Sequence, residues 1–237
     1  PERVTPPRLD RALCDACGRC AGTCPGKALL MAGREYSLDE VLVRIKKDML
    51  FYRNSGGGVT LSGGEVLSQH AFAVELCGRC AALGIHTAIE TSGFAPYEHF
   101  RALALAADVI FYDIKHLDPV RHRRLTGQDN RLILENLAHF LAETGKPVHV
   151  RLPLVPGLND DAAHLEAYGA YLGGLPGGPE TVDLEVLPYH RLGKDKYAML
   201  GREYGLGDTP PMPRDEAEAA VRRLRGRAGG LKIFCAA

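Results

Sequence analysis

Four cysteines with regular spacing lie near the start of the chain. Cys14, Cys17, Cys20 and Cys24 are followed by Pro25, which gives the pattern C-x2-C-x2-C-x3-C-P. This is the bacterial ferredoxin half-motif, whose thiolates hold a [4Fe–4S] cluster. Structural zinc sites more often use pairs of cysteines that lie well apart in the sequence. The spacing therefore predicts an iron–sulfur cluster rather than zinc.

The fourth cysteine leaves two arrangements open. In two-cluster ferredoxins the first three cysteines hold one cluster, and the fourth reaches the cluster of a partner motif. No second motif of this kind occurs in the 237 residues. Either the partner motif lies in a segment ahead of this sequence, or Cys24 completes a single cluster with Cys14, Cys17 and Cys20.

The other three cysteines lack such a pattern. Cys77 and Cys80 lie in a stretch that is expected to form an amphipathic helix, and Cys235 stands near the end of the chain. A buried free cysteine behaves as a small apolar residue. We predict that Cys77 and Cys80 pack in the core and bind no metal.

A glycine-rich segment, Gly56 to Glu65, combines backbone freedom with a carboxylate. Gly58 and Gly63 have the spacing of the outer glycines in a phosphate-binding loop, but the lysine and hydroxyl residue that such a loop needs are missing. Paired glycines at the end of a strand let a ligand approach the backbone closely. The carboxylate favours a cationic group such as an α-ammonium over phosphate. A tight turn with a solvated glutamate explains the segment equally well.

The elements that must position these residues form a regular alternation. Short, nearly continuous apolar runs alternate with helical stretches, which predicts a parallel sheet covered by helices. The predicted strands are 58–62, 86–91, 109–114, 148–154 and 182–188, and the predicted helices are 38–49, 66–83, 96–107, 130–144, 160–173 and 214–228. Ser37 and Glu40 form a capping-box pattern at the first of these helices.

Polar residues stand at or just beyond the carboxyl ends of the predicted strands. In parallel α/β folds this edge of the sheet binds ligands, so we expect these side chains to form one site. They are Glu65, Glu90 with Thr91, Asp113 with Lys115, Arg151, and His190.

Composition excludes several classes of partner. The 29 basic side chains balance the 29 acidic ones, so no overall field attracts nucleic acid or an anionic membrane. The longest apolar run is far shorter than the roughly 20 residues that a membrane span needs. We find no signal peptide, and a cytoplasmic location is expected.

Taken together, these segments resemble the activating enzymes of glycyl radical enzymes. This is a branch of the radical S-adenosylmethionine (SAM) superfamily, similar to pyruvate formate-lyase activating enzyme but carrying a ferredoxin-like insert. The segments that carry the resemblance are 14–25, FYRNSGGGVTLSGGE (51–65), GIHTAIETSG (84–93), FYDIKHLD (111–118), RLTG (124–127), ILENL (133–137), RLPLVPGLND (151–160) and LPYHRLGKDKY (187–197).

The resemblance implies a fold and a domain division. It implies an α/β fold, a partial parallel (β/α)6 barrel similar to a TIM barrel, with a small ferredoxin-like iron–sulfur insert at the N-terminus. Residues 1–36 would hold the [4Fe–4S] half-motif and a connector, and residues 37–237 the radical SAM barrel without its first strand and cluster loop.

The resemblance also implies roles for residues along the upper rim of the barrel, where SAM would bind. Ser62, Gly63, Gly64 and Glu65 match the glycine–glycine–glutamate segment that receives the methionyl ammonium. Arg151 matches an arginine that faces the cofactor and the incoming glycine loop. Further matches are Glu90 and Thr91 (an acidic–threonine pair near the cofactor), Asp113, Ile114 and Lys115 (an Asp-x-Lys motif that contacts the methionine end, directly or through a monovalent cation), and His190 (a cofactor contact from the last strand).

The sequence departs from the family pattern in three places. Val66 stands where proline is usual, and Ser92 where cysteine or asparagine is common. The C-x3-C-x2-C motif, whose cluster binds SAM in this superfamily, does not occur in the 237 residues. Because the chain begins with Pro1 and a polar, proline-rich run, we expect an N-terminal truncation and an inactive fragment.

The implied activity is reductive cleavage of SAM, followed by removal of a hydrogen atom from a backbone glycine of a partner glycyl radical enzyme, as in [formate-C-acetyltransferase]-activating enzyme. Flavodoxin or ferredoxin would supply the electron. Two alternatives stay open at this point. One is an iron–sulfur electron-transfer module without SAM chemistry, and the other is a barrel aldolase with Lys115 as its Schiff-base lysine.

Overall fold

The computed structural model describes residues 9–31 and 33–236. The chain divides into two compact units, Pro1–Val41 and Leu42–Ala237. This division falls close to the expected boundary at residues 36 and 37, but it does not test the functions assigned to the two parts. Those assignments stay predictions.

The described part of the first unit, residues 9–31 and 33–41, contains little regular structure. Its helix α1 (Arg19–Thr23) is short, and Gly18 precedes it in the left-handed conformation at φ 74°. At the start of helix α2 (Leu38–Ile45), the backbone N–H of Glu40 donates to Ser37 Oγ and the backbone N–H of Ser37 donates to the Glu40 carboxylate. The capping box is therefore confirmed, although the helix is shorter than expected and continues as the 3₁₀ turn η1 (Lys46–Asp48).

The second unit is built on a six-stranded parallel sheet whose strand order follows the sequence. Its strands are β1 (Gly58–Leu61), β2 (His86–Thr91), β3 (Val109–Asp113), β4 (Val148–Leu154), β5 (Val182–Pro188) and β6 (Lys232–Cys235). No pairing joins β1 to β6 among the described residues, so the sheet is open between its edge strands. The expected α/β class and partial barrel are confirmed.

Alternation along the strands separates an apolar face from a polar one. In β4, Val148, Val150 and Leu152 are buried, whereas His149 and Arg151 between them are half-buried. Neighbouring strands keep this alternation in register, since Asp113 lies opposite Arg151 and Arg151 opposite Glu185. Because side chains in a strand alternate between faces, one face carries the core and the other carries the chemistry.

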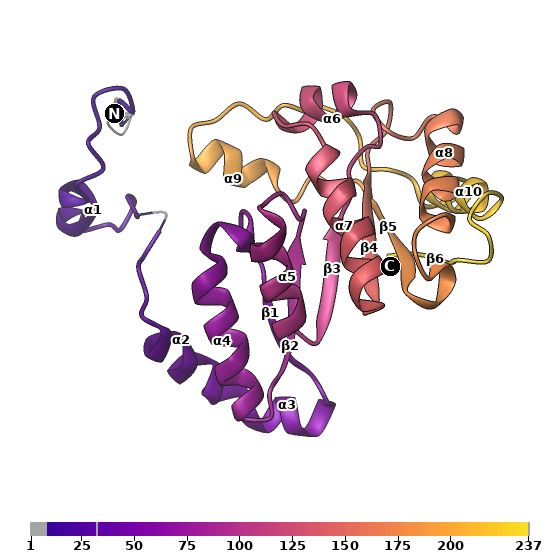
Figure 1. The fold of residues 1–237 in the computed structure, drawn as a ribbon. Helices are drawn as coiled ribbons and strands as arrows, with labels where there is room; N and C mark the ends of the chain where they lie inside the picture. The colour runs from indigo at the N-terminus through magenta and orange to yellow at the C-terminus, as the bar shows by residue number, and fades with distance from the viewer. Residues whose placement is uncertain (1–8, 32, 237) are drawn as a thin grey trace. The chain divides into compact units, whose positions relative to one another are not determined.

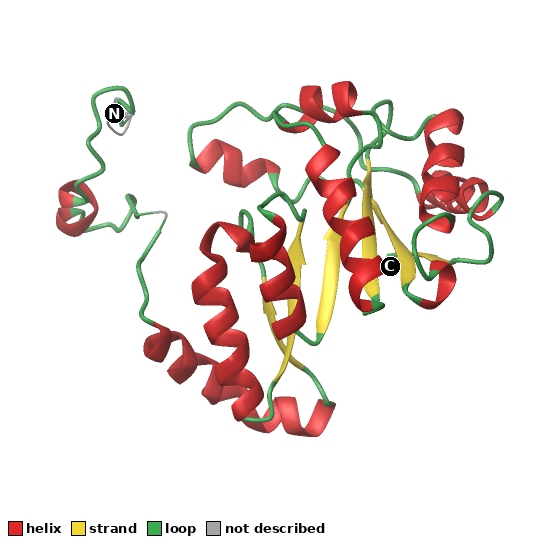
Figure 2. Cartoon of the chain, in the orientation of Figure 1, coloured by secondary structure: helices red, strands yellow, loops and turns green. Residues whose placement is uncertain are grey.

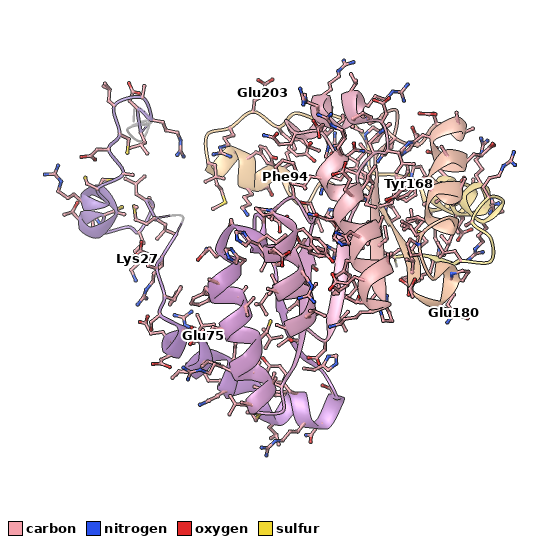
Figure 3. All side chains as sticks on the ribbon, in the orientation of Figure 1. Lys27, Glu75, Phe94, Tyr168, Glu180 and Glu203 are labelled. Atoms are coloured by element: carbon pink, nitrogen blue, oxygen red, sulfur yellow. The ribbon has the colours of Figure 1, made fainter. Side chains whose placement is uncertain are left out.

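Helices cover the apolar face of the sheet (Figures 1 and 2). They are α4 (His70–Ala82), which follows the 3₁₀ turn η2 (Val66–Gln69), α5 (Tyr97–Ala106), α7 (Arg131–Thr144), α8 (Ala162–Gly173) and α10 (Arg214–Arg225), whereas the short helix α6 (Pro119–Thr126) lies beyond the strand ends (Figure 1). Tyr168 of α8 is wholly buried and donates its hydroxyl to the backbone oxygen of Ile114 (Figure 3). Cys77 and Cys80 of α4 have no exposed surface, which confirms that they pack in the core.

Besides the 3₁₀ turn η3 (Gly178–Glu180), five elements were not expected from the sequence. They are the helices α1, α3 (Met49–Ser55), α6 and α9 (Lys194–Met199) and the strand β6. The helices are only five to eight residues long and bury almost none of their residues, so the sequence carries little apolar periodicity there. No helix in the described part of the chain is long and apolar enough to cross a membrane.

Candidate cofactor site

A polar pocket lies at the carboxyl ends of β1 to β4, all within the second unit. Its volume is about 180 Å³, and it is lined by Ser62, Gly63, Gly64, Glu65, Glu90, Thr91, Ser92, Asp113, Lys115 and Arg151. Nine of these ten residues were expected at the site, and Ser92 was noted only as a departure from the family pattern. The structure therefore brings together residues that lie up to ninety positions apart in sequence.

Glu65 fastens the end of β1 to the end of β2. One carboxylate oxygen accepts from the Leu67 N–H at 3.1 Å and from Thr91 Oγ1 at 2.6 Å. The other accepts from the Ser92 N–H at 2.9 Å and from Ser92 Oγ at 2.7 Å. A carboxylate offers about four acceptor positions. All of them are in use, so this side chain holds the glycine-rich turn in place.

Arg151 lies between two carboxylates on the polar face of the sheet. Its Nε is 2.9 Å from Asp113 Oδ1, and its Nη1 is 2.8 Å from Glu90 Oε1. Lys115 Nζ lies 3.4 Å from the other Asp113 oxygen. Beneath the guanidinium, the ring of Phe111 lies 5.2 Å away. The two acids and two bases balance in charge, and the Arg151 side chain is only 13% exposed.

Electrostatics keep this arginine charged. Burial disfavours the charged form of Arg151, but hydrogen bonds and the negative charges of Glu90 and Asp113 outweigh this effect, and the pKa of Arg151 is raised. A charged, preorganised guanidinium in a polar pocket suits recognition of a carboxylate.

Two expected site residues do not line the pocket. Ile114 is wholly buried on the opposite face of β3, and its backbone N–H donates to the Arg151 oxygen. His190 follows β5 as an exposed residue, and its Nδ1 accepts from the Leu192 N–H at 3.3 Å. Their expected contacts with a cofactor stay predictions.

The cysteines of the first unit are not gathered into a cluster site. Within the described residues, no group of three or more histidine, cysteine, aspartate or glutamate side chains is arranged to hold a metal ion. The backbone N–H groups of Leu29 and Ala28 lower the pKa of the Cys24 thiol, which favours the thiolate that iron binds. The donor chemistry suits a [4Fe–4S] cluster but the arrangement does not, and this cluster stays a prediction.

The expected monovalent cation would compete with side chains already present. Both carboxylate oxygens of Asp113 contact cationic groups, one on Arg151 and one on Lys115. The cation therefore also stays a prediction.

The loop that carries Lys115 packs on a buried pair of histidines. The rings of His116 and His164 stack with 3.9 Å between their centroids, and the Nε2 atoms of both are buried without a hydrogen-bond partner. Burial, followed by the charge of His116, lowers the pKa of His164 to about 4. Asp118, Asp161 and Arg121 are the other charged groups that act on this histidine.

This pair predicts a loss of stability in mild acid. An unfolded histidine titrates near pH 6.5, so the unfolded state binds more protons than the folded state as the pH falls from about 6.5 towards 4. The stability present above pH 6.5 should be lost over this range, and His164→Phe should flatten the pH dependence of urea unfolding. The exposed His139, changed to phenylalanine, is the control. Equal slopes for the two variants would contradict the assignment.

Comparisons with known proteins show the family to which the chain belongs. Residues 17–167 match the family model of the radical SAM superfamily. The isethionate sulfite-lyase activating enzyme of Nitratidesulfovibrio vulgaris is 43% identical over 218 residues, which cover 90% of this chain and 69% of that protein. The trans-4-hydroxy-L-proline dehydratase activating enzyme of Clostridioides difficile is 39% identical, with 89% and 78% covered.

A solved structure agrees as well. A domain of pyruvate-formate lyase-activating enzyme from Bacteroides vulgatus superposes with a TM-score of 0.62 and 27% identity, covering 76% of this chain and 99% of that domain. The chain spans 64% to 69% of the length of the isethionate sulfite-lyase activating enzymes that it matches. From the matched family, the fold and these relatives, the chain belongs to the radical SAM superfamily, among the activating enzymes of glycyl radical enzymes.

Proposed function

We propose that this protein takes part in activating a glycyl radical enzyme, and that the pocket at the ends of β1 to β4 binds the methionyl end of SAM. The observation that carries the proposal is the convergence of a glycine-rich turn, three carboxylates and a half-buried arginine in one polar pocket. SAM carries an ammonium and a carboxylate at that end, and the pocket offers charges of both signs.

The side chains divide into contacting and positioning groups in this proposal. Arg151 and Lys115 provide positive charge for the methionyl carboxylate. Backbone carbonyl groups of the Gly63–Gly64 turn accept from the ammonium. Glu65 positions this turn through its bonds to β2, a different role from the direct ammonium contact that the family resemblance implies.

The chemistry itself belongs to the cofactors. The one electron that cleaves SAM would come from a [4Fe–4S] cluster on the C-x3-C-x2-C motif, which does not occur in the 237 residues, and SAM would in turn supply the group that takes a hydrogen atom from a backbone glycine of the partner. This chain's residues hold SAM, orient it and exclude water from its reacting bond.

The proposal extends to a second cluster, the division into domains, the reductant and the partner. We infer that the cysteines at 14–24 hold a second [4Fe–4S] cluster, in a part ending near residue 36, with the barrel in 37–237. Flavodoxin or ferredoxin would act as reductant in the cytoplasm. The partner is a glycyl radical enzyme, and relatives of similar identity are named for isethionate, choline and trans-4-hydroxy-L-proline enzymes.

Calorimetric titration of SAM into the 237-residue chain tests the site. Saturable binding with one site per chain is expected, and S-adenosylhomocysteine, which lacks the sulfonium charge, should report on the same methionyl contacts. An iron–sulfur carrier without SAM chemistry would show no saturable binding. An aldolase would be trapped on Lys115 by borohydride with a carbonyl substrate, and family membership already argues against it.

Glu65→Gln should weaken SAM binding about tenfold to a hundredfold, because the charged hydrogen bonds that hold the turn contribute roughly 1.5–3 kcal/mol. In this variant the side-chain NH2 of glutamine would face N–H and O–H groups that now donate to a carboxylate oxygen of Glu65. The melting temperature should therefore fall as well. Glu75→Gln is the matched control on the surface of α4, where Glu75 pairs with Arg79 at 3.3 Å (Figure 3). Unchanged affinity in Glu65→Gln would remove this residue from the site.

A further inference from the structure

Three asparagines of the second unit are almost completely buried. Asn130 is 1% exposed, and Asn136 and Asn159 are each 3% exposed. They come from different places in the fold, at the start of α7, within α7, and in the loop after β4. Buried amides lower stability unless they are hydrogen-bonded, so each position needs a physical reason.

Each of these asparagines uses its side-chain nitrogen to bridge two backbone carbonyl groups. Asn136 donates to Gly93 and Ala95 at 2.8 and 2.9 Å. Asn130 donates to His116 and Leu117, both at 2.7 Å. Asn159 donates to Lys115 and Pro153 at 2.9 and 2.8 Å. Since both partners of each side-chain nitrogen are carbonyl oxygens, the nitrogen must face them, and in Asn159 the oxygen also accepts from the Val155 N–H at 2.8 Å.

The bridged carbonyls share one location in the fold. All six lie at or just beyond the carboxyl ends of β2, β3 and β4, the strand ends that form the polar pocket. Lys115 itself lines the pocket, and Gly93 directly follows Ser92, which also lines it. At the amino ends of the same strands, the described residues show no asparagine bridge, and there Lys146 Nζ joins the carbonyl oxygens of Ala104 and Ala107.

Asn130 shows that the donor side of the amide is what matters. Its side-chain oxygen is buried without a hydrogen-bond partner, which carries a free-energy cost. An apolar residue would avoid this cost. The position nevertheless holds an amide whose nitrogen bonds to the turn after β3.

From this arrangement, we propose that Asn130, Asn136 and Asn159 are positioning residues of the SAM pocket, which hold the loops after β2, β3 and β4 at fixed spacing. This inference rests on the proposed function. Asn136 acts through the Gly93 turn on Ser92, and Ser92 holds Glu65 and the glycine-rich turn. Asn159 fixes the spacing of the β3 and β4 ends, and hence the pairing of Asp113 with Arg151.

The test compares Asn136→Leu and Asn159→Leu with a control at the opposite end of the sheet. Leucine has nearly the shape of asparagine but donates no hydrogen bond. Thr87→Val is the control, because Thr87 is 1% exposed and its hydroxyl donates to Asp108 at the amino end of β2. SAM affinity by calorimetry and thermal stability are measured for each variant.

We expect both asparagine variants to lose at least tenfold in SAM affinity and Thr87→Val to stay within twofold, at comparable losses of thermal stability. Serine keeps one donor, so Asn136→Ser and Asn159→Ser should recover part of the affinity, and they provide the readout if a leucine variant does not fold. Equal affinities in all variants would overturn the proposal and leave the asparagines a purely structural role.

Amide hydrogen exchange on the chain without SAM separates this inference from the proposed function. The Ser92 N–H donates to Glu65, and it should exchange at least tenfold faster in Asn136→Leu but not in Thr87→Val. If the parent chain failed to bind SAM while this acceleration was seen, the proposed function would fail and the positioning role would stand. Unchanged exchange would overturn the positioning role, whether or not SAM binds.

Discussion

Replacing Arg151 with methionine is expected to abolish measurable SAM binding and to lower the free energy of unfolding by about 2–4 kcal/mol, slightly less than the roughly 3–5 kcal/mol for breaking a fully buried ion pair. The reason is that Glu90 and Asp113 would face each other across the pocket with only Lys115 left nearby. Their side chains are 34% and 22% exposed, so water relieves part of this repulsion.

The size of this effect depends on burial, and a second arginine tests that dependence. Arg121 also pairs with an aspartate, Asp161 at 3.0 Å, but its side chain is 59% exposed. Exposed ion pairs contribute less than about 1 kcal/mol, so Arg121→Met should be nearly neutral in urea unfolding and in SAM titration. A loss in Arg121→Met as large as that in Arg151→Met would show that the pocket geometry is not the cause.

The pocket could largely be predicted from sequence because parallel strands deliver their carboxyl ends to one edge. Five of the six strands were identified almost to the residue, since nearly continuous apolar runs of five to seven residues are typical of strands buried in a parallel sheet, whereas β6 was missed. The position of Ile114 follows from the same alternation. It lies between Asp113 and Lys115, so its side chain must point to the core face of β3.

Other features depend on contacts that no local pattern encodes. The role of Ser92 appears only when the end of β2 is placed beside Glu65. The sequence likewise does not show which asparagines are buried, because asparagine is common in exposed turns and caps. His190 was expected at the pocket because it follows a strand, but it is an exposed residue two positions beyond the end of β5 and does not line the pocket, so its contact with a cofactor stays a prediction.

The second large effect is expected from Gly93→Ala, which should lower the free energy of unfolding by about 2–5 kcal/mol through left-handed strain and overpacking together. Gly93 has φ 72°, and a Cβ atom there would lie 1.8 Å from the hydroxyl oxygen of Tyr112. Tyr112 cannot move aside, since it is wholly buried, donates to the Ile133 oxygen at 2.7 Å and packs edge-on against Phe100.

Gly84→Ala separates the two contributions to this loss. Gly84 has nearly the same backbone conformation, φ 69°, but a Cβ atom there would meet nothing within 4 Å. It should therefore lose only the roughly 1–2 kcal/mol of left-handed strain, with SAM affinity unchanged. In Gly93→Ala, the turn itself must shift away from Tyr112, and the adjoining Ser92 should then loosen its bonds to Glu65, so SAM affinity should fall together with stability. Equal losses of stability in the two variants, measured by urea unfolding, would mean that the turn after β2 yields to the added methyl group and that Tyr112 does not constrain it.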